Sequence, residues 1–494
     1  MALDSLIPYI VLTGYLLVTL VVGIVGYRQQ QNTPDDYFLA DRNMGAILLF
    51  FTLIATNFSA LAFLGFSGSG YRIGLSYYGM MGFGTGLIAL TIYLIGYRVW
   101  LVGKEHGLIT PSELIETRFR STGVSPGISN TLKLVFLAVM VIFSIPYLTL
   151  QPIGAGYILE TLTNGQIPYF TGATFLTVVI VLYVFMGGMK SVALTDVIQG
   201  VLMFTLMLAA LAAIASSLGG ITEANRTVYT LKPELFSRQG IDNFFTHRKW
   251  FSFMILWMLS VPMFPQMFMR FYASKTSNSL KLSVVMYPLV SGIMFICPVL
   301  IGMWGHISFS DLTEKASDQV FPMMLAEHTP IWLASLVMVG ALAAIMSTLD
   351  SVLLALSSIL TRDIYFGYLR KNASLKEQTI VGRVLIVLLA TIGLIIAKNP
   401  PDTIIAIATQ ALTGLAVLFP TVIAVLYSKT IHPLTCIVSI LVGEAAVIGF
   451  QLEIIPKSLT FGFLPVVPIV ALSALIIIVG SIKPIRRLVN SRES

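Results

Sequence analysis

One apolar segment, at 340–365, concentrates side chains that suit the binding of a cation. Ser347, Asp350 and Ser351 are spaced i, i+3 and i+4, so on a helix they share one face, with Thr348 beside them. A carboxylate in mid-membrane costs at least about 2.5–3.5 kcal/mol, so Asp350 must face a partner, a cation or water. Hydroxyl and carboxylate oxygens are hard donors that suit a hard cation. Hydrogen bonds back to the helix's own carbonyls would explain Ser347 or Thr348 alone, but not Asp350.

Four other polar residues interrupt apolar runs, and each has more than one explanation. Asp196 is a second candidate for an intramembrane carboxylate, but capping at the membrane surface or a salt bridge to Lys190 explains it equally well. Gln151 and Gln410 are explained by hydrogen bonds between helices at least as readily as by a ligand. For Glu444 we expect a structural contact.

The composition excludes most soluble classes of protein. Of 494 residues, 56% are hydrophobic and 11% are charged, and the mean hydropathy is +0.88. A soluble chain carries about 25% charged residues, so a nucleic-acid-binding protein, a secreted disulfide scaffold and a soluble multidomain enzyme are poor fits. Cys297 and Cys436 lie inside apolar runs, and the common nucleophile, phosphate-loop and metalloprotease motifs do not occur. We predict a polytopic membrane protein that is not an enzyme.

Apolar runs of about 20 residues predict helices that cross the hydrocarbon core. There are thirteen such runs, which gives an all-α fold class with thirteen transmembrane helices. The first run has no basic region before it and no small-residue cleavage site after it, so we predict a retained helix. The runs are centred on 6–27, 45–70, 76–103, 130–162, 167–188, 191–218, 249–272, 281–307, 330–361, 378–397, 402–427, 431–451 and 461–482.

The distribution of Lys and Arg predicts the orientation, because short cytoplasmic connections carry an excess of them. One set of connections holds only Arg72, Lys315, Lys398 and Lys457, apart from a long loop to which the rule gives less weight. We therefore expect a multi-pass protein of the cell membrane, with its N-terminus outside and its C-terminus in the cytoplasm. The opposite set holds Arg28, Arg42, Arg98, Lys104, Arg118, Arg120, Lys190, Arg270, Lys275, Arg362, Arg370, Lys371, Lys376, Lys429, Lys483, Arg486, Arg487 and Arg492.

Two of the predicted spans contain residues that interrupt a helix. The span at 45–70 has polar residues and glycines in its second half, and the span at 249–272 has two prolines, so we expect unwinding at 56–60 and at 260–265. Each of these spans opens a group of five. Because five is odd, the second group runs inverted relative to the first, and interrupted helices at matching positions of inverted repeats point to a transport site. The alternative is two ordinary kinks.

Several motifs together resemble the sodium/solute symporter family, whose members carry proline, pantothenate, sugars, sialic acid or monocarboxylates. The segments that carry the resemblance are DDYFLADRNMG at 35–45, the interrupted span that follows it, GMKSVALTDVIQG at 188–200, PQMFMRF at 265–271 and AAIMSTLDS at 343–351. The resemblance covers essentially the whole chain.

The resemblance implies a leucine-transporter-like core built from a 5+5 inverted repeat. One peripheral helix precedes this core and two follow it. The implied units are 1–30 for the first peripheral helix, 45–218 and 249–427 for the two five-helix repeats, and 431–494 for the last two helices and a cytoplasmic tail.

The resemblance also implies where sodium ions bind. The family's shared sodium site uses backbone carbonyls on the first core helix, and a carbonyl and two hydroxyls on the eighth. The corresponding residues are Ala55, Phe58, Ala344, Ser347 and Thr348. Some members hold a further sodium ion, for which the corresponding residues are Asp196, Ser347, Asp350 and Ser351. The family would have a hydroxyl at the position of Asp350. The second site could therefore bind sodium more strongly, bind it in an altered way, or couple to protons, and these alternatives stay open.

The solute cavity of the family lies between the two broken helices and three of their neighbours. No Lys or Arg is expected to project into it, so a multiply charged anion is disfavoured, and a sugar would require more Asn, Gln and Glu. A monocarboxylate or a zwitterion fits better, with its carboxylate held by backbone N–H groups at a broken-helix end. Core packing also explains each aromatic residue here. The corresponding residues are Asn57, Ser59, Ala62, Tyr77, Met81, Tyr147, Gln151, Trp257, Val261 and Gln410.

The predicted function is import of a small organic solute, coupled to a sodium ion, by alternating access. The solute and the lipid bilayer are the expected partners, with no nucleic acid and no obligate protein partner. One alternative is a proton-coupled carrier of the same fold, which would use Asp350 and Asp196. Another is a solute-sensing receptor, because some relatives fuse this module to a histidine kinase. No soluble domain follows the last predicted span, which disfavours the receptor.

Overall fold

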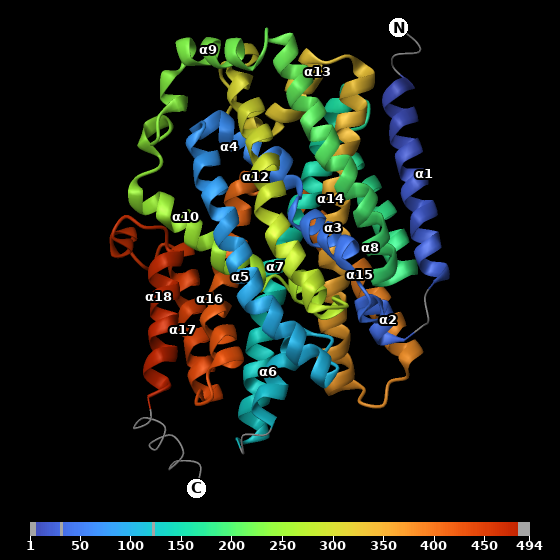
Figure 1. Ribbon diagram of the computed structural model, residues 1–494, viewed down its shortest axis with the longest axis vertical. Coiled ribbons are helices and arrows are strands. Elements are labelled where there is room, and N and C mark those ends of the chain that lie inside the picture. Colours follow the sequence, from blue (N-terminus) through green and yellow to red (C-terminus); the bar gives the residue numbers. More distant parts are fainter. Residues whose placement is uncertain (1–5, 30–32, 121–123, 483–494) are drawn as a thin grey trace.

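The computed structural model describes residues 6–29, 33–120 and 124–482, and these form one elongated bundle of helices (Figure 1). The expected cytoplasmic tail, with Lys483, Arg486, Arg487 and Arg492, lies outside the described residues. The predicted all-helical membrane fold is confirmed.

Nine helices of the described ranges are long and apolar enough to cross a membrane, and two bent pairs raise the number to eleven. The predicted spans at 167–188 and 461–482 hold shorter apolar helices, so the total of thirteen spans stays a prediction. The shorter helices are Tyr169–Phe185 in α8 (Tyr169–Ser217) and α18 (Val466–Gly480). The nine are α1 (Ile7–Arg28), α5 (Ser76–His106), α7 (Pro126–Leu162), Gly187–Ser217 of α8, α12 (Ser277–Ser308), α14 (Ile331–Ile359) with its continuation to Leu369, α15 (Leu375–Ala397), α16 (Ile404–Tyr427) and α17 (Pro433–Gln451).

The first expected break follows α3 (Ala46–Asn57), where the chain bends by 57° before a π-helical turn at Leu61–Gly65 that leads into α4 (Phe66–Ile73). Phe58 leaves the helix with an extended backbone (φ −85°, ψ 108°). The amide oxygen of Gln151 accepts a hydrogen bond from the N–H of Ala60 at 3.1 Å. A side chain of α7 thus satisfies a backbone donor that the break leaves free, as hydrocarbon surroundings require.

The second break separates α10 (His247–Ser260) from α11 (Pro265–Ala273), and the chain bends by 54° there. A short turn at Val261–Met263 is followed by Phe264 in an extended conformation. Pro265 then takes the first position of α11, where its missing N–H costs nothing. Both predicted breaks are therefore confirmed.

Short helices cover the two ends of the bundle. At one end lie α9 (Ile221–Leu231) and α13 (Val320–His328), and at the other lies α6 (Pro111–Arg120) (Figure 1). The N–H of Glu113 donates to the hydroxyl of Thr110, and the carboxylate of Glu113 accepts from the N–H of Thr110, each at 3.3 Å. This reciprocal cap starts the helix at Pro111.

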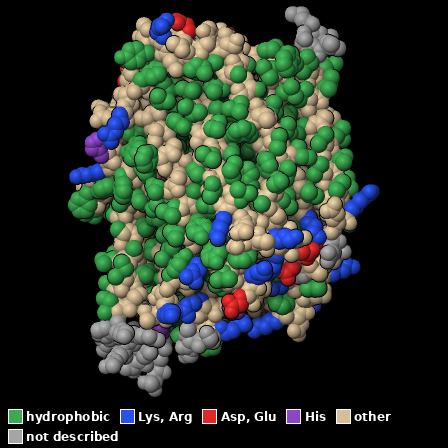
Figure 2. All heavy atoms as spheres, viewed as in Figure 1, with side chains coloured by type: hydrophobic (Ala, Val, Ile, Leu, Met, Phe, Trp, Pro, Cys, Tyr) green, Lys and Arg blue, Asp and Glu red, His purple; other side chains and the backbone are tan. Residues whose placement is uncertain are grey.

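The surface agrees with a membrane environment. Figure 2 shows apolar side chains over most of the face in view, and Lys and Arg gathered towards the end at which α6 lies. An apolar surface of this extent suits lipid and not water. The boundaries of the two repeats, 45–218 and 249–427, stay a prediction.

Candidate ion and solute site

The hydroxyls of α14 meet the end of α3. Thr348 donates to the carbonyls of Thr56 and Phe58, each at 3.2 Å, and Ser347 donates to the carboxylate of Asp196 on α8. Both hydroxyls therefore bond to other helices, and the explanation by bonds to their own helix is wrong. Since α3 stops at Asn57, the carbonyls of its last turn lack the usual helical partners. Oxygens from two helices thus converge beside the break.

Arg270 of α11 lies at the centre of the buried polar cluster next to this break. Its side chain is 0% exposed and pairs with Asp196 at 3.3 Å. It also donates to the hydroxyl of Ser351 at 2.5 Å, and to the hydroxyl and the carbonyl of Thr52 at 2.9 and 3.0 Å. Lys190 pairs instead with Asp36 and Asp41, so the proposed bridge between Lys190 and Asp196 is wrong.

Asp350 is the second carboxylate of this cluster. Tyr183 of α8 donates to it at 2.6 Å, and the hydroxyl of Ser351 donates at 3.1 Å. Ser351 in turn accepts from the hydroxyl of Thr56 at 2.9 Å. Asp350 is fully buried, and its partners are protein groups from two helices.

Arg270 and Tyr183 were not among the expected site residues. Arg270 was counted with the cytoplasmic charges, and its burial removes it from that set. A signal was present, because Arg270 falls inside the predicted span at 249–272, where a cation requires a partner. Tyr183 gave no signal, because buried tyrosines are common in apolar spans.

The expected solute residues divide into three groups. Six of them line one small cavity between the broken helices: Asn57, Ala62, Met81, Tyr147, Trp257 and Val261. Its volume is about 20 Å³, room for little more than one water molecule. None of its lining residues within the described ranges is Lys or Arg, as expected. The indole N–H of Trp257 has no hydrogen-bond partner among the described residues.

Three more expected residues lie next to the cavity without lining it. Ser59 accepts from the hydroxyl of Tyr147 at 3.4 Å, and Gln151 holds the break in α3 as described above. Tyr77 packs its ring against Phe66, at 5.3 Å between centroids. These residues support the cavity wall.

Gln410 does not belong to the cavity. It is exposed and lines a different groove, together with Glu444, between α7, α16 and α17. The structure thus does not place it with the other expected solute residues. The helix that carries Gln410, α16, is apolar on nearly all sides, so the spacing of its apolar residues does not indicate which face turns towards the cavity.

The oxygens beside the break in α3 suit sodium. Carbonyl and hydroxyl oxygens are hard, neutral donors, and the set contains no sulfur or nitrogen ligand. Since the hydroxyl of Ser347 donates its hydrogen bond to Asp196, its lone pairs are free to face a cation. Two broken helices around a buried polar centre, within an apolar bundle, define a membrane transport protein.

A family model for the "Sodium:solute symporter family" matches residues 37–443, and the chain belongs to this family. The resemblance inferred from the motifs is confirmed. The protein is thus a sodium-coupled solute symporter and not an enzyme.

Named relatives match along nearly their whole length. The chain is 27% identical to a sodium/pantothenate symporter of Escherichia coli (strain K12), over 97% of each chain. It is 25% identical to a sodium/proline symporter of Haemophilus influenzae, over 98% of this chain and 96% of that one.

Solved structures share the fold. A Na⁺-coupled sialic acid symporter in a substrate-bound outward-open state has a TM-score of 0.78 at 19% identity, over 96% of this chain and 97% of that one. A nucleobase-cation-symport-1 family transporter in a closed conformation has a TM-score of 0.59 at 12% identity, over 93% and 95%. The expected leucine-transporter-like architecture is confirmed at the level of the fold.

Replacing Arg270 by Leu should lower the free energy of unfolding by about 3–5 kcal/mol, because Asp196 would remain as a buried charge without its partner. Denaturant unfolding in detergent measures this. The control is Arg120→Leu, whose ion pair with Glu116 is exposed and worth about 1 kcal/mol or less. Equal losses in the two variants would contradict a structural role for Arg270.

Proposed function

We propose that this protein imports a small monocarboxylate or zwitterion together with sodium, by alternating access. The observation that carries the proposal is the hydrogen bond from Thr348 to the carbonyl of Phe58. This bond joins the end of the broken helix α3 to the unbroken helix α14, at a place where several oxygen atoms lie together. A cation there binds both helices at once. Its arrival and departure would then bias the angle between them, which is what coupling requires.

The proposed sodium ligands are those implied by the family motif. They are the carbonyls of Ala55, Phe58 and Ala344 and the hydroxyls of Ser347 and Thr348. The hydrogen bonds of both hydroxyls to groups outside α14 support this set. The excess of Lys and Arg at the end of the bundle where α6 lies supports an extracellular N-terminus and a cytoplasmic C-terminus.

The solute is proposed from the chemistry of the cavity. Trp257 offers an unpaired N–H donor, and Asn57 and Tyr147 add polar groups to a wall that is otherwise mainly apolar. An unpaired donor favours a solute with an acceptor such as a carboxylate, and the apolar wall favours a hydrocarbon body. Pantothenate and proline, the solutes named for the two relatives, both satisfy this description.

Uptake into vesicles tests the proposal. The purified chain is reconstituted and offered labelled pantothenate, proline or lactate under an imposed sodium gradient or an imposed proton gradient. We expect the sodium gradient alone to drive accumulation of at least one solute. Trp257→Phe should raise the KM for it about tenfold, because one hydrogen bond to a charged group is lost. Accumulation driven only by protons would favour the proton-coupled carrier, and binding without accumulation would favour the receptor.

Ser347→Ala and Thr348→Ala should each raise the sodium concentration for half-maximal uptake roughly tenfold, because each removes one oxygen from the ion. The matched control is Ser357→Ala. It lies on the same helix, is equally buried, and bonds to the carbonyl of Leu354. Normal sodium dependence in both test variants would contradict the proposed ligands.

The second sodium ion, expected between Asp196, Ser347, Asp350 and Ser351, has a competitor. Two buried carboxylates repel unless a positive charge lies between them, and Arg270 supplies one through Asp196 and Ser351. We propose that this guanidinium takes the place of the second ion.

The sodium Hill coefficient of uptake should then be near one, both in the wild type and in Asp350→Asn. The coefficient is read from initial uptake rates over a range of sodium concentrations at fixed pH. A coefficient near two that falls to near one in Asp350→Asn would restore the second sodium site.

A further inference from the structure

Glu444 is an ionisable residue inside α17 that takes no part in the ion or solute site. It is 9% exposed, and neither of its carboxylate oxygens has a hydrogen-bond partner among the described residues. The structural contact expected from the sequence is therefore not made. A carboxylate in hydrocarbon surroundings without a partner is costly, so its presence requires another explanation.

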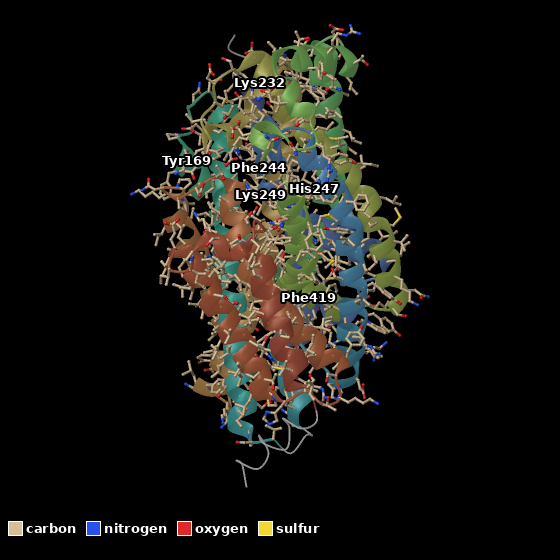
Figure 3. The ribbon with its side chains drawn as sticks, turned by 90° about the vertical axis from the view of Figure 1, so that its left-hand side faces the viewer. Tyr169, Lys232, Phe244, His247, Lys249 and Phe419 are labelled. Carbon is tan, nitrogen blue, oxygen red and sulfur yellow. The ribbon has the colours of Figure 1, made fainter. Side chains whose placement is uncertain are left out.

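Glu444 lines a groove of about 410 Å³ between α7, α16 and α17. On one wall, Val135, Val139 and Ile142 follow a single apolar face of α7. Among the described residues of the lining, the only polar side chains apart from Glu444 are the exposed amides of Gln410 and Gln451. Figure 3 shows the side of the bundle on which α16 and its neighbours lie, with Phe419 of α16 labelled.

The groove is rich in hydrogen-bond acceptors. Pro146 has no N–H, so the carbonyl of Ile142, in the same groove, loses its helical donor. The Glu444 carboxylate is an acceptor only, whereas the amides of Gln410 and Gln451 offer both an acceptor oxygen and neutral N–H donors. No Lys, Arg or His is found among the described residues that line the groove, so the compensating positive charge is not supplied from there.

We propose that this groove binds a bilayer lipid with a primary ammonium headgroup, whose ammonium pairs with Glu444 and whose acyl chain lies along α7. An ammonium carries one positive charge and three N–H donors, which suits a carboxylate in a groove that also holds neutral acceptors. A hydroxyl headgroup would leave the charge unpaired, and a choline headgroup has no N–H to donate.

The position of Glu444 along α17 suits such a headgroup. Gln451 ends the helix seven residues later, about 10 Å away along the axis. The exposed ion pair of Glu453 with Lys457 follows and indicates the water side. The headgroup layer is about 5–7 Å thick, so Glu444 lies just inside the hydrocarbon, within reach of an ammonium on a short linker.

A second copy of this chain fits the groove less well. Glu444 is the only charged residue of α17, and α18 has none. A symmetric dimer through this face would bring two Glu444 side chains together with no cation. The lipid is the occupant that supplies the missing charge.

Native mass spectrometry of the full chain tests the proposal. The protein in detergent is incubated with equal amounts of dioleoyl phosphatidylethanolamine, phosphatidylcholine and phosphatidylglycerol. We expect the wild type to retain the ethanolamine lipid about tenfold more than the choline lipid, and Glu444→Gln to lose that preference. Ile448→Trp, which narrows the groove but keeps the charge, should lower retention of the ethanolamine lipid as well.

Glu453→Gln is the matched control, because it makes the same change near the same end of α17 but outside the groove. It should retain the wild-type preference. Thermal melting identifies folded variants, and Glu444→Gln should melt no lower than the wild type because it removes a buried charge. Equal retention of the two lipids by the wild type, or an unchanged preference in Glu444→Gln, would overturn the proposal. A dimer that carries no lipid and dissociates in Glu444→Gln would overturn it in favour of a second copy.

Discussion

The guanidinium of Arg270 holds the centre of this molecule together. It extends from the second broken helix and contacts Thr52 on α3, Asp196 on α8 and Ser351 on α14. Four helices therefore share one buried charge and its hydrogen bonds. In a medium without water such a network has to be complete, because each unpaired member would cost more than its bond contributes. The broken helices are positioned by this network as much as by their apolar faces.

The same lack of water explains why the breaks occur where they do. A break in a transmembrane helix frees backbone groups, and these need partners from other helices. Gln151 and Thr348 serve as such partners at the break in α3. The side chains that bond to the freed backbone groups also bring oxygen atoms together beside the break. The same contacts therefore stabilise the broken helix and form the candidate ion site.

Glu444 also illustrates that a carboxylate in surroundings without water requires a partner. The cluster around Arg270 pairs its two carboxylates inside the protein, whereas Glu444 has no protein partner among the described residues. It lines a groove between α7, α16 and α17, and the lipid proposed there would supply its partner from the bilayer. The proposed lipid site lies between α7, α16 and α17, apart from the buried cluster around Arg270.

Local sequence determined the helical membrane fold, the position of both breaks and the polar face of α14, because apolar run length, proline and i, i+3, i+4 spacing act within one helix. The partners across helices were decided by tertiary structure. The sequence places Arg270 among the cytoplasmic charges and leaves Lys190 as one possible partner of Asp196, which are errors that the structure corrects by burying Arg270 against Asp196 and pairing Lys190 with Asp36 and Asp41. Gln410, expected at the solute cavity, lines a different groove. Each error concerns the face that a nearly uniformly apolar helix turns towards its neighbours. A membrane span has no polar side to indicate its rotation, so only packing against other helices sets it.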